Sequence, residues 1–251
     1  MVEIDTQRTR SAAAADLFIQ VKPERDFELL WALRALFQGK PIQPDIEACT
    51  GVSLNVINDL AERMKRCQYG ALFAGAGLIT ARARHYNAQA VLSLVIDLNQ
   101  HTRFVALPML EQGNAAGAGN VLAWQTGYPF AVNFGRGFPR FSPGEFSTVD
   151  LLARGEADAA LIVASDPAPS LPEAALAHLK RIPTIVLHRK PTATTVIAKI
   201  AFATACYGIN TGGTVYRMDD VSLALRPALS SAYPADETIL VALRDRIQQM
   251  I

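Results

Sequence analysis

The sequence predicts an α/β fold with a doubly wound, mostly parallel sheet, and three observations support this prediction. Short apolar runs alternate with helical patterns along the chain at the spacing of βαβ units. Of the 251 residues, 50% are hydrophobic and 19% are charged, a composition that excludes a disordered chain. The length is sufficient to bury a large core, and it fits one α/β unit of two closely packed lobes, approximately 1–110 and 111–251.

The first lobe contains two predicted helices and two predicted strands. A helical stripe begins near Phe27 and ends at Gly39. Ser53 is placed to cap a second helix, whose apolar face comprises Leu54, Ile57, Leu60, Ala61 and Met64. An apolar run over 69–77 predicts a buried strand that leads into a glycine turn, and another run predicts a strand over about 103–107.

The second lobe repeats the alternation of helices and strands. Ser142 and Glu145 form a predicted capping box, with Pro143 at the first position of a helix that continues to about Arg154. Strands are predicted over 160–167 and 184–188, separated by a helix that carries Leu176 and Leu179. A final helix has Asp236 and Glu237 in its first turn, and its apolar residues are expected to face inward: Ile239, Leu240, Leu243, Ile247 and Met250. We expect helices to cover both faces of the sheet.

Charge and cysteine content exclude several classes of function. The net charge is +1, so neither a nucleic-acid partner nor an anionic membrane is expected. The longest uncharged stretch, 112–135, is broken by polar residues, glycine and proline and does not fit a membrane span. Three scattered cysteines and four scattered histidines show no iron–sulfur, zinc or other metal-binding spacing. The first ten residues lack a signal peptide, so we expect a cytoplasmic protein.

Ligands of open α/β sheets bind beyond the carboxyl ends of the strands, so the strand-to-helix turns are the first candidates. The glycines of 75–84 fit either a packing turn or a close approach to phosphate. Ser165 and Asp166 follow a strand, where the carboxylate could bind a ribose or a guanine edge or could simply end the strand in an Asx-type turn. A glycine-rich loop over 208–220 contains Thr214 and Arg217. No nucleophile and base pattern is present, so no catalytic residue is predicted.

The longest candidate segment, 113–145, holds seven glycines and has no acidic residue before Glu145. Its glycines and Asn120 could open a helix whose amides face an anion, with Arg136 and Arg140 providing positive charge. Its aromatic residues and arginines equally have the composition of a protein–protein contact. Both interpretations stay open. The candidate ligand-binding or interface residues of the whole chain are Gly113, Asn114, Gly117, Gly119, Asn120, Trp124, Gln125, Arg136, Arg140, Ser165, Asp166, Thr214 and Arg217.

The run 113–145 resembles the signature stretch of the B subunits of formylmethanofuran dehydrogenase and of the related bacterial formyltransferase/hydrolase complex. Residues 4–33, 163–167 and 211–227 resemble further segments of the same family, so the similarity covers nearly the whole chain. The resemblance implies a molybdopterin-oxidoreductase-like fold, truncated because the N-terminal cluster-binding region has no counterpart here. It also implies one-carbon metabolism linked to tetrahydromethanopterin. An apolar sheet edge is expected to be exposed where that region is missing.

Departures from the family pattern indicate which member type the chain resembles. None of its cysteines lies at a position that resembles a cluster or metal ligand, and His188 and Lys199 stand where the family has acidic residues. The resemblance then implies a structural, non-redox component without a cofactor. Its partners would be the other components of the same complex: an amidohydrolase-like A subunit, a formyltransferase-like D subunit and the C subunit.

Two alternatives remain. The chain is a functional part of a dehydrogenase that reduces CO2 to formate with molybdopterin guanine dinucleotide and molybdenum or tungsten. The candidate arginines and Asp166 could still bind such a cofactor. The missing cysteines would then belong to a region upstream of Met1 or to a second chain. Otherwise, it is an unrelated α/β protein that binds a small anionic ligand.

Overall fold

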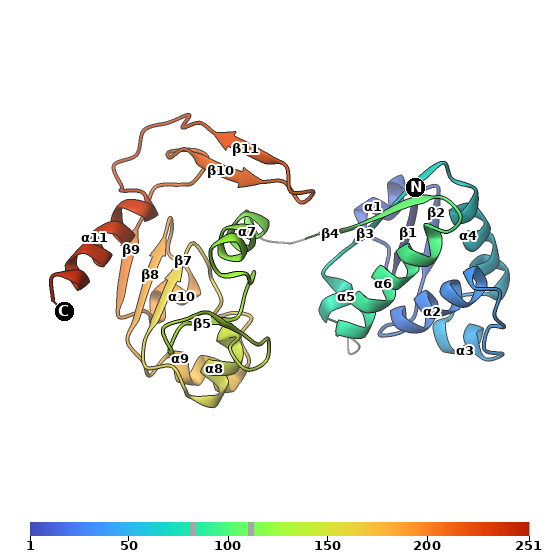
Figure 1. Ribbon diagram of the computed structural model, residues 1–251, viewed down its shortest axis with the longest axis horizontal. Coiled ribbons are helices and arrows are strands. Elements are labelled where there is room, and N and C mark those ends of the chain that lie inside the picture. Colours follow the sequence, from blue (N-terminus) through green and yellow to red (C-terminus); the bar gives the residue numbers. More distant parts are fainter. Residues whose placement is uncertain (81–83, 110–112, 251) are drawn as a thin grey trace. The chain divides into compact units, whose positions relative to one another are not determined.

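The structure is a computed structural model that describes residues 1–80, 84–109 and 113–250. It divides into two compact units, Met1–Gly113 and Asn114–Ile251 (Figure 1). Each unit contains parallel strands connected through helices, which confirms a mixed α/β fold with parallel sheets. In the part of the chain that is described, the strands form several short sheets, and none of these shows the reversal of strand order that a doubly wound sheet has.

The first unit has two pairs of parallel strands. Strand β1 (Val2–Asp5) pairs with β2 (Leu17–Gln20), with the short helix α1 (Arg10–Ala14) between them. Strand β3 (Tyr69–Ala74) pairs with β4 (Arg103–Pro108). The predicted strands therefore exist, but the expectation that β3 is buried is wrong. Tyr69 and Phe73 are each 60% exposed, because alternate residues of a strand point to opposite faces and only one face packs on the core.

Helices build the core of the first unit. They are α2 (Asp26–Phe37), α3 (Ile46–Thr50), α4 (Leu54–Arg66), α5 (Gly77–Thr80) and α6 (Arg84–Leu98). The predicted cap is confirmed, since the Ser53 hydroxyl accepts a hydrogen bond from Val56 N at 3.4 Å. Fully buried side chains from three helices meet in this core: Leu29, Leu33, Ile57, Leu94 and Leu98. Part of the candidate turn 75–84 lies outside the described residues.

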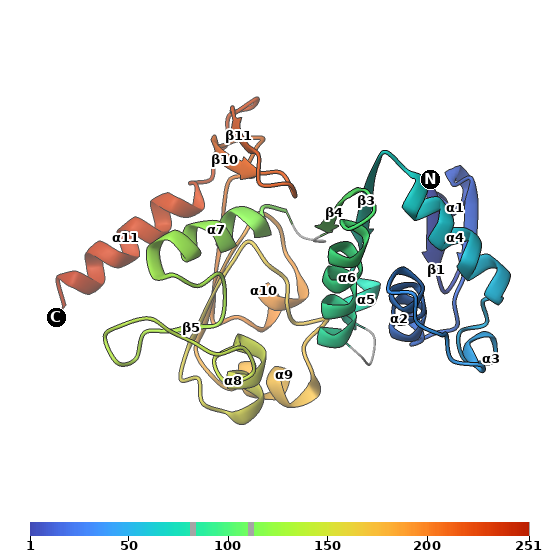
Figure 2. The ribbon, with the colours of Figure 1, turned by 45° about the vertical axis from the view of Figure 1, so that its right-hand side comes forward.

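The second unit contains a three-stranded parallel sheet in the order β7 (Ala160–Val163), β8 (Thr184–His188) and β9 (Ile200–Ala203). Helices α8 (Thr148–Arg154) and α9 (Glu173–Leu179) lie side by side in both views (Figures 1 and 2). Leu152, Ala175 and Leu179 of these helices form a small core over Ala160 and Ile162 of β7.

The opposite face of this sheet is covered at its centre, where Leu187 of β8 is fully buried, but its two outer strands are exposed, so it is not covered along its whole width as predicted. Leu161 and Val163 of β7 are 52% and 38% exposed, and Ile200 and Phe202 of β9 are 47% and 36% exposed. The register places all four side chains on one face, together with Ile185 and Leu187. The short helix α10 (Ala193–Ile197) connects β8 to β9.

The remaining elements are α7 (Ala115–Thr126), the strand pair β5 (Val132–Asn133) and β6 (Arg140–Phe141), the hairpin β10 (Gly213–Tyr216) and β11 (Ser222–Leu225), and α11 (Asp236–Gln248). Helix α11 was predicted, but its expected inward face is only partly covered: Ile239, Leu240 and Leu243 are half-buried, whereas Ile247 is 55% and Met250 is 75% exposed. Both views show the helix at the periphery of its unit (Figures 1 and 2). Amphipathic spacing identifies an apolar face without saying what covers it.

The helix predicted to begin at Pro143 begins instead at Thr148, after the N-cap residue Ser147. Gly144 has φ +87°, in the left-handed region, so the chain turns there and no helix can continue through it. The Ser142 carbonyl accepts hydrogen bonds from Glu145 N at 3.2 Å and Phe146 N at 2.8 Å, which closes this turn. The predicted capping box is therefore wrong.

Within the described ranges, none of the helices has both the length and the apolar character needed to cross a membrane.

Candidate functional site

Helix α7 begins directly after Asn114, the first of the predicted site residues in the second unit. Asn114 is the N-cap residue and has φ 59°, a left-handed conformation that asparagine tolerates better than most residues. Gly117, Gly119 and Asn120 therefore lie inside the helix. The suggested helix exists, but it begins at Ala115, before Gly117 and Gly119 instead of after them. Gly113 lies in a turn at the end of the first unit.

The Asn114 side chain attaches the β10–β11 hairpin to α7. Its Nδ2 donates to Thr214 O at 3.1 Å, and its Oδ1 accepts from Tyr216 N at 2.8 Å. Further along the helix, Asn120 Nδ2 donates to Asp220 Oδ1 at 3.0 Å. The Trp124 ring lies 6.5 Å from the Tyr216 ring, measured between centroids. Segments 100 residues apart in sequence are thus brought together, with side chains of the predicted site as the connecting groups.

The two buried glycines of α7 make room for side chains. A Cβ atom at Gly117 would overlap the amide of Asn114, and one at Gly119 would lie 2.9 Å from Phe130 Cζ. Glycine at both positions therefore lets these two side chains pack closely against the helix. This use of the glycines favours packing over a phosphate cradle, one of the two alternatives left open by the sequence.

Residues 127–146 form a structured loop, which we call the aromatic loop. The Tyr128 and Phe141 rings stack at its base, 5.0 Å apart and nearly parallel at 2°. Strands β5 and β6 are antiparallel, and Val132 pairs with Phe141 and Asn133 with Arg140. At the tip, Phe134–Phe138, Gly137 N donates to Phe134 O at 2.8 Å, and Gly137 has φ +80°. Gly135 N donates to Asn133 Oδ1 at 2.8 Å, so both ends of the tip are held.

The two arginines of the aromatic loop differ in their surroundings. The Arg140 guanidinium lies 4.7 Å from the centre of the Phe146 ring and donates from Nη2 to Asn133 Oδ1 at 3.1 Å. Its Nε is buried and has no hydrogen-bond partner in the described part of the chain. Arg136 is exposed at the tip, between two exposed phenylalanines. Arg140 therefore stabilises the loop, and Arg136 carries its outward charge.

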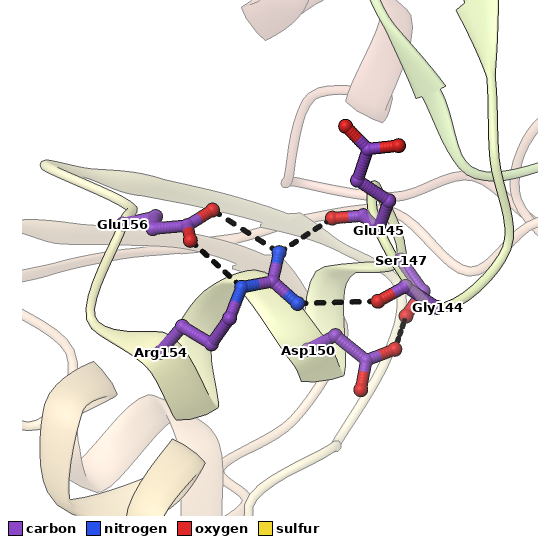
Figure 3. Close-up of polar contacts among 6 residues, drawn as sticks. All are labelled: Gly144, Glu145, Ser147, Asp150, Arg154 and Glu156. Atoms are coloured by element: carbon purple, nitrogen blue, oxygen red, sulfur yellow. Dashed lines mark hydrogen bonds and ion pairs between the residues drawn. The ribbon is translucent and has the colours of Figure 1, made fainter.

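Arg154 of α8 anchors the end of the aromatic loop (Figure 3). Its Nη1 donates to Gly144 O at 3.1 Å, and its Nη2 donates to Glu145 O at 2.6 Å. Glu156 forms an ion pair with the same guanidinium, 2.7 Å from Nε. This hydrogen bond lowers the pKa of the Glu156 carboxyl and raises that of Arg154. Ser147 donates a hydrogen bond to Asp150, which orders the first turn of α8.

Ser165 and Asp166 follow β7, at the carboxyl edge of the parallel sheet. The Asp166 carboxylate accepts from Thr194 N at 2.8 Å and from the Thr194 hydroxyl at 2.5 Å. The bond from the Thr194 hydroxyl is the main cause of the lowered pKa of Asp166. Thr194 Oγ1 also accepts from Ala168 N at 3.0 Å. The carboxylate therefore connects the turn after β7 to the start of α10, and Ser165 lies half-buried beside it.

The other predicted residues lie apart from this edge. Arg217 donates from Nε to Asp219 Oδ1 at 2.6 Å, and this bonding raises its pKa while lowering that of Asp219. Gln125 is exposed on α7. The predicted residues consequently form several internal contacts, and they do not converge on one pocket.

A cavity of about 480 Å³ lies elsewhere in the second unit, and sequence reasoning missed most of it. The only signal was the glycine-rich loop 208–220, which forms one wall. None of the predicted site residues lines it; its walls are Ala205, Tyr207, Thr211, Gly212, Gly213, Ala235, Asp236, Glu237, Leu240, Val241 and Arg244. Among the residues that the structure describes, no three histidine, cysteine or acidic side chains gather as a metal-binding group.

Comparison with known proteins shows similarity along the whole chain. It is 39% identical over 253 residues to the B subunit of tungsten-containing formylmethanofuran dehydrogenase 2 of Methanocaldococcus jannaschii, and 35% identical to that of Methanococcus maripaludis over 252 residues. Both alignments cover 100% of this chain and 58% of the relative, so the chain spans little more than half of their length. No family model matches the chain.

Relatives from the bacterial complex are also found. The B subunit of the formyltransferase/hydrolase complex of Methylorubrum extorquens is 37% identical over 111 residues, which is 44% of this chain and 30% of that protein. A crystal structure of that complex with methylofuran contains a chain with a TM-score of 0.71 and 24% identity, covering 97% of this chain and 68% of that chain. The structural likeness shows a shared fold. The resemblance predicted from the sequence is confirmed.

Proposed function

We propose that this chain, a homologue of the B subunits of formylmethanofuran dehydrogenase and of the formyltransferase/hydrolase complex, is itself the B subunit of such a complex in one-carbon metabolism. The single observation that carries this proposal is the similarity to B subunits along the entire chain. The partners would be an amidohydrolase-like A subunit, the C subunit and a formyltransferase-like D subunit, acting in the cytoplasm on one-carbon units linked to tetrahydromethanopterin.

Within that complex, we propose a structural role without a redox centre. The groups that would contact a ligand are engaged inside the chain: Asp166 with Thr194, Arg217 with Asp219, and Asn114 with β10. Releasing any of them to bind a ligand would first break these hydrogen bonds, at about 1 kcal/mol or more each. The geometry thus supports a scaffold better than a binding cleft.

The residues at the carboxyl edge of the β7–β8–β9 sheet do not fit the guanine end of a molybdopterin guanine dinucleotide. Carboxylates recognise guanine at the edge that presents N–H donors. A guanine site therefore needs side-chain oxygens that are free to accept hydrogen bonds. Asp166 Oδ1 already accepts both hydrogen bonds from Thr194, which leaves Oδ2 as the acceptor of that carboxylate, and β8 offers no second carboxylate because it ends in His188, followed by Arg189 and Lys190. We therefore derive no reaction step through such a cofactor. We also propose a molybdopterin-oxidoreductase-like fold, which is supported by the mixed α/β architecture with parallel sheets and by the fold shared with the bacterial relative.

One specific observation favours a second candidate. The two relatives that match over the whole chain are both B subunits of tungsten-containing enzymes, whereas the bacterial B subunit aligns with 44% of the chain. In this alternative, the chain is a functional part of a dehydrogenase that reduces CO2 to formate. Additional polypeptide, corresponding to the part of these relatives that the chain does not match, would complete its metal site.

Purification of the tagged chain from its native host, with mass spectrometry of the bound proteins, distinguishes these proposals. The structural role predicts amidohydrolase-like and formyltransferase-like partners, with no stoichiometric molybdenum or tungsten by inductively coupled plasma mass spectrometry. Iron–sulfur proteins, a stoichiometric metal and a fluorescent pterin released on denaturation would establish the second candidate. Purification of the chain without any partner would contradict both and would favour a protein that acts alone on a small ligand.

A further inference from the structure

We propose that the tip of the aromatic loop, Phe134–Phe138, inserts into another protein of the complex, at a surface with apolar pockets beside a carboxylate. This inference rests on the proposed function and names the element that makes the contact. The sequence left an anion site and a protein contact equally open for this segment. The observations below favour the protein contact.

Four large aromatic side chains that are more than half exposed fall within the short segment 124–138 of the second unit. Phe134 and Phe138 at the tip are 54% and 55% exposed, and Phe130 is 55% exposed. Trp124, on the adjoining helix α7, is 63% exposed. Single exposed apolar residues are common on proteins, but a cluster of aromatic residues with an arginine has the composition of an interface hot spot.

The tip is held in one conformation by contacts that do not use its outward side chains. The stacked pair Tyr128 and Phe141 closes the base, and Asn133 Oδ1 accepts hydrogen bonds from Gly135 N and Arg140 Nη2. Arg154 binds the carbonyls of the turn that ends the loop (Figure 3). A loop ordered before binding loses little conformational entropy on association, so its exposed side chains can contribute fully to affinity.

Charge defines the chemistry of the partner. Residues 113–144 contain no aspartate or glutamate, and the Arg140 guanidinium is occupied by Phe146 and Asn133. Arg136 therefore presents the positive charge of the tip, flanked on each side by a glycine and then a phenylalanine. A carboxylate on the partner, with apolar pockets beside it for the two rings, would complement this arrangement.

A small anionic ligand fits these observations less well. Small-molecule sites are concave and collect several polar groups, whereas the tip residues do not line the cavity described above. The spaces beside the α7 glycines, which would have admitted a phosphate, are filled by Asn114 and Phe130. Arg136 is the arginine exposed at the tip, and one exposed arginine gives little affinity for an anion in water.

The test replaces the two tip rings in the tagged chain, as the double variant Phe134→Ser and Phe138→Ser, and purifies the complex from the native host. We expect at least about tenfold less of the partner proteins to be recovered at equal amounts of bait. Leu229→Ser is the matched control, since Leu229 is 66% exposed in the same unit but outside the loop, and it should leave recovery unchanged. Equal circular dichroism spectra of the variant and control chains show that folding is intact.

Two further experiments test the charge of Arg136 and the contact made by Phe138 separately. Arg136→Glu should lower recovery about tenfold and Arg136→Lys much less, while Arg246→Glu, at an exposed site on α11, should have no effect. A photo-crosslinking phenylalanine analogue at position 138 should link the chain to one partner protein, next to an aspartate or glutamate.

The outcomes separate the inference from the function on which it rests. A wild-type chain that brings down its partners, with the double serine variant bringing down as much, overturns the inference and leaves the proposed function standing. A crosslink only to a second copy of this chain also overturns it. A wild-type chain that brings down nothing overturns both.

Discussion

The two units of this chain reach their folds by different means. The first unit buries large aliphatic side chains from α2, α4 and α6 in one continuous core, including Leu33, Ile57 and Leu94. The second unit has a smaller buried cluster of Leu152, Ala175 and Leu179, supported by partly buried neighbours, and it also buries Val186 and Leu187 of β8. On one face of its sheet the outer strands β7 and β9 are exposed, as is the tip of the aromatic loop, and no residue of α11 is buried.

Hydrogen bonds from side chains replace hydrophobic burial at several places in the second unit. Asn114 attaches the β10–β11 hairpin, Asp166 connects β7 to α10, and Arg154 holds the aromatic loop. Such bonds fix geometry, but each contributes only about 1 kcal/mol. The difference indicates a first unit that is stable by itself and a second unit whose apolar surfaces are suited to binding other polypeptides.

Separating the two units should give the largest effect. We expect residues 1–113, expressed alone, to unfold cooperatively on heating, because their core is internal to that segment. Residues 114–251 alone should bind a hydrophobic dye strongly and aggregate at micromolar concentration. Circular dichroism melts and dye fluorescence of the two segments provide the measurement. Equal cooperativity and equal dye binding in the two segments would contradict the expected difference in stability between the two units.

Removal of the buried ion pair of the first unit should have the next largest effect. Arg34 Nε lies 2.7 Å from Asp97 Oδ2, the two side chains are only 13% and 9% exposed, and Gln38 donates to both oxygens of the carboxylate. Asp97→Ala strands a buried guanidinium, so we expect a loss of about 3–5 kcal/mol in the free energy of unfolding. Urea titration measures this change.

Asp59→Ala is the control for that variant. Asp59 forms an ion pair with Arg63 at 2.6 Å, but the two side chains are 54% and 57% exposed. We therefore expect it to lower the free energy of unfolding by no more than about 0.5 kcal/mol. A similar loss in both variants would show that burial of the Arg34–Asp97 pair is not what stabilises the first unit.

Local signals in the sequence predicted much of the fold but little of the site. The cap at Ser53, the strand Thr184–His188 and the helix of the first core depend on neighbouring residues, which the sequence displays directly. The start of α8 was missed because a serine, a proline and a glutamate imitate a capping box, whereas Gly144 takes a left-handed conformation. Whether a glycine adopts a left-handed conformation depends on the residues packed around it, which the local sequence does not show.

Contacts between distant segments could not be predicted. Asn114 meets β10 about a hundred residues later in the chain, and Asp166 meets Thr194 28 residues later. Nothing in the sequence near Asn114 indicates its partner, so its glycine-rich surroundings suggested an anion site instead. The cavity beside α11 was missed for the same reason, since it forms only when the loop 208–213 and that helix come together.

The Asn114 contact provides a smaller perturbation of the second unit. Asn114→Gly keeps the left-handed backbone but removes both bonds to β10, so we expect amide exchange at Tyr216 to become at least about tenfold faster. Asn114→Ala should be about 1 kcal/mol less stable than the glycine variant, because alanine disfavours φ 59°. Asn120→Ala, which loses one exposed bond to Asp220, should leave exchange at Tyr216 nearly unchanged. Equal exchange rates in the wild type and Asn114→Gly would mean that the hairpin is held by other contacts.

The smallest effect should come from Asp166, through the dependence of stability on pH. Its pKa is lowered in the folded chain by hydrogen bonds from Thr194, so its contribution to stability is fully present above its unfolded pKa of about 4 and is lost as the pH falls through the folded pKa. Thr194→Val removes the hydroxyl donor, so we expect the pKa of Asp166 to rise toward its ordinary value in an NMR titration. Because the carboxylate is exposed, we expect this bond to contribute little to the pH dependence of stability, whereas the loss of the acceptor for Ala168 N lowers stability equally at all pH values.

Asp219 is the internal control in the same spectra. Its pKa is lowered by Arg217 and not by Thr194, so it should not move in the Thr194→Val variant. An unchanged pKa at Asp166 would show that the Thr194 hydroxyl does not hold this carboxylate, which would leave it more available to a ligand at the carboxyl edge of the sheet, although the bond from Thr194 N remains. This titration therefore also tests whether the second unit is organised for its own internal bonds or for a bound cofactor.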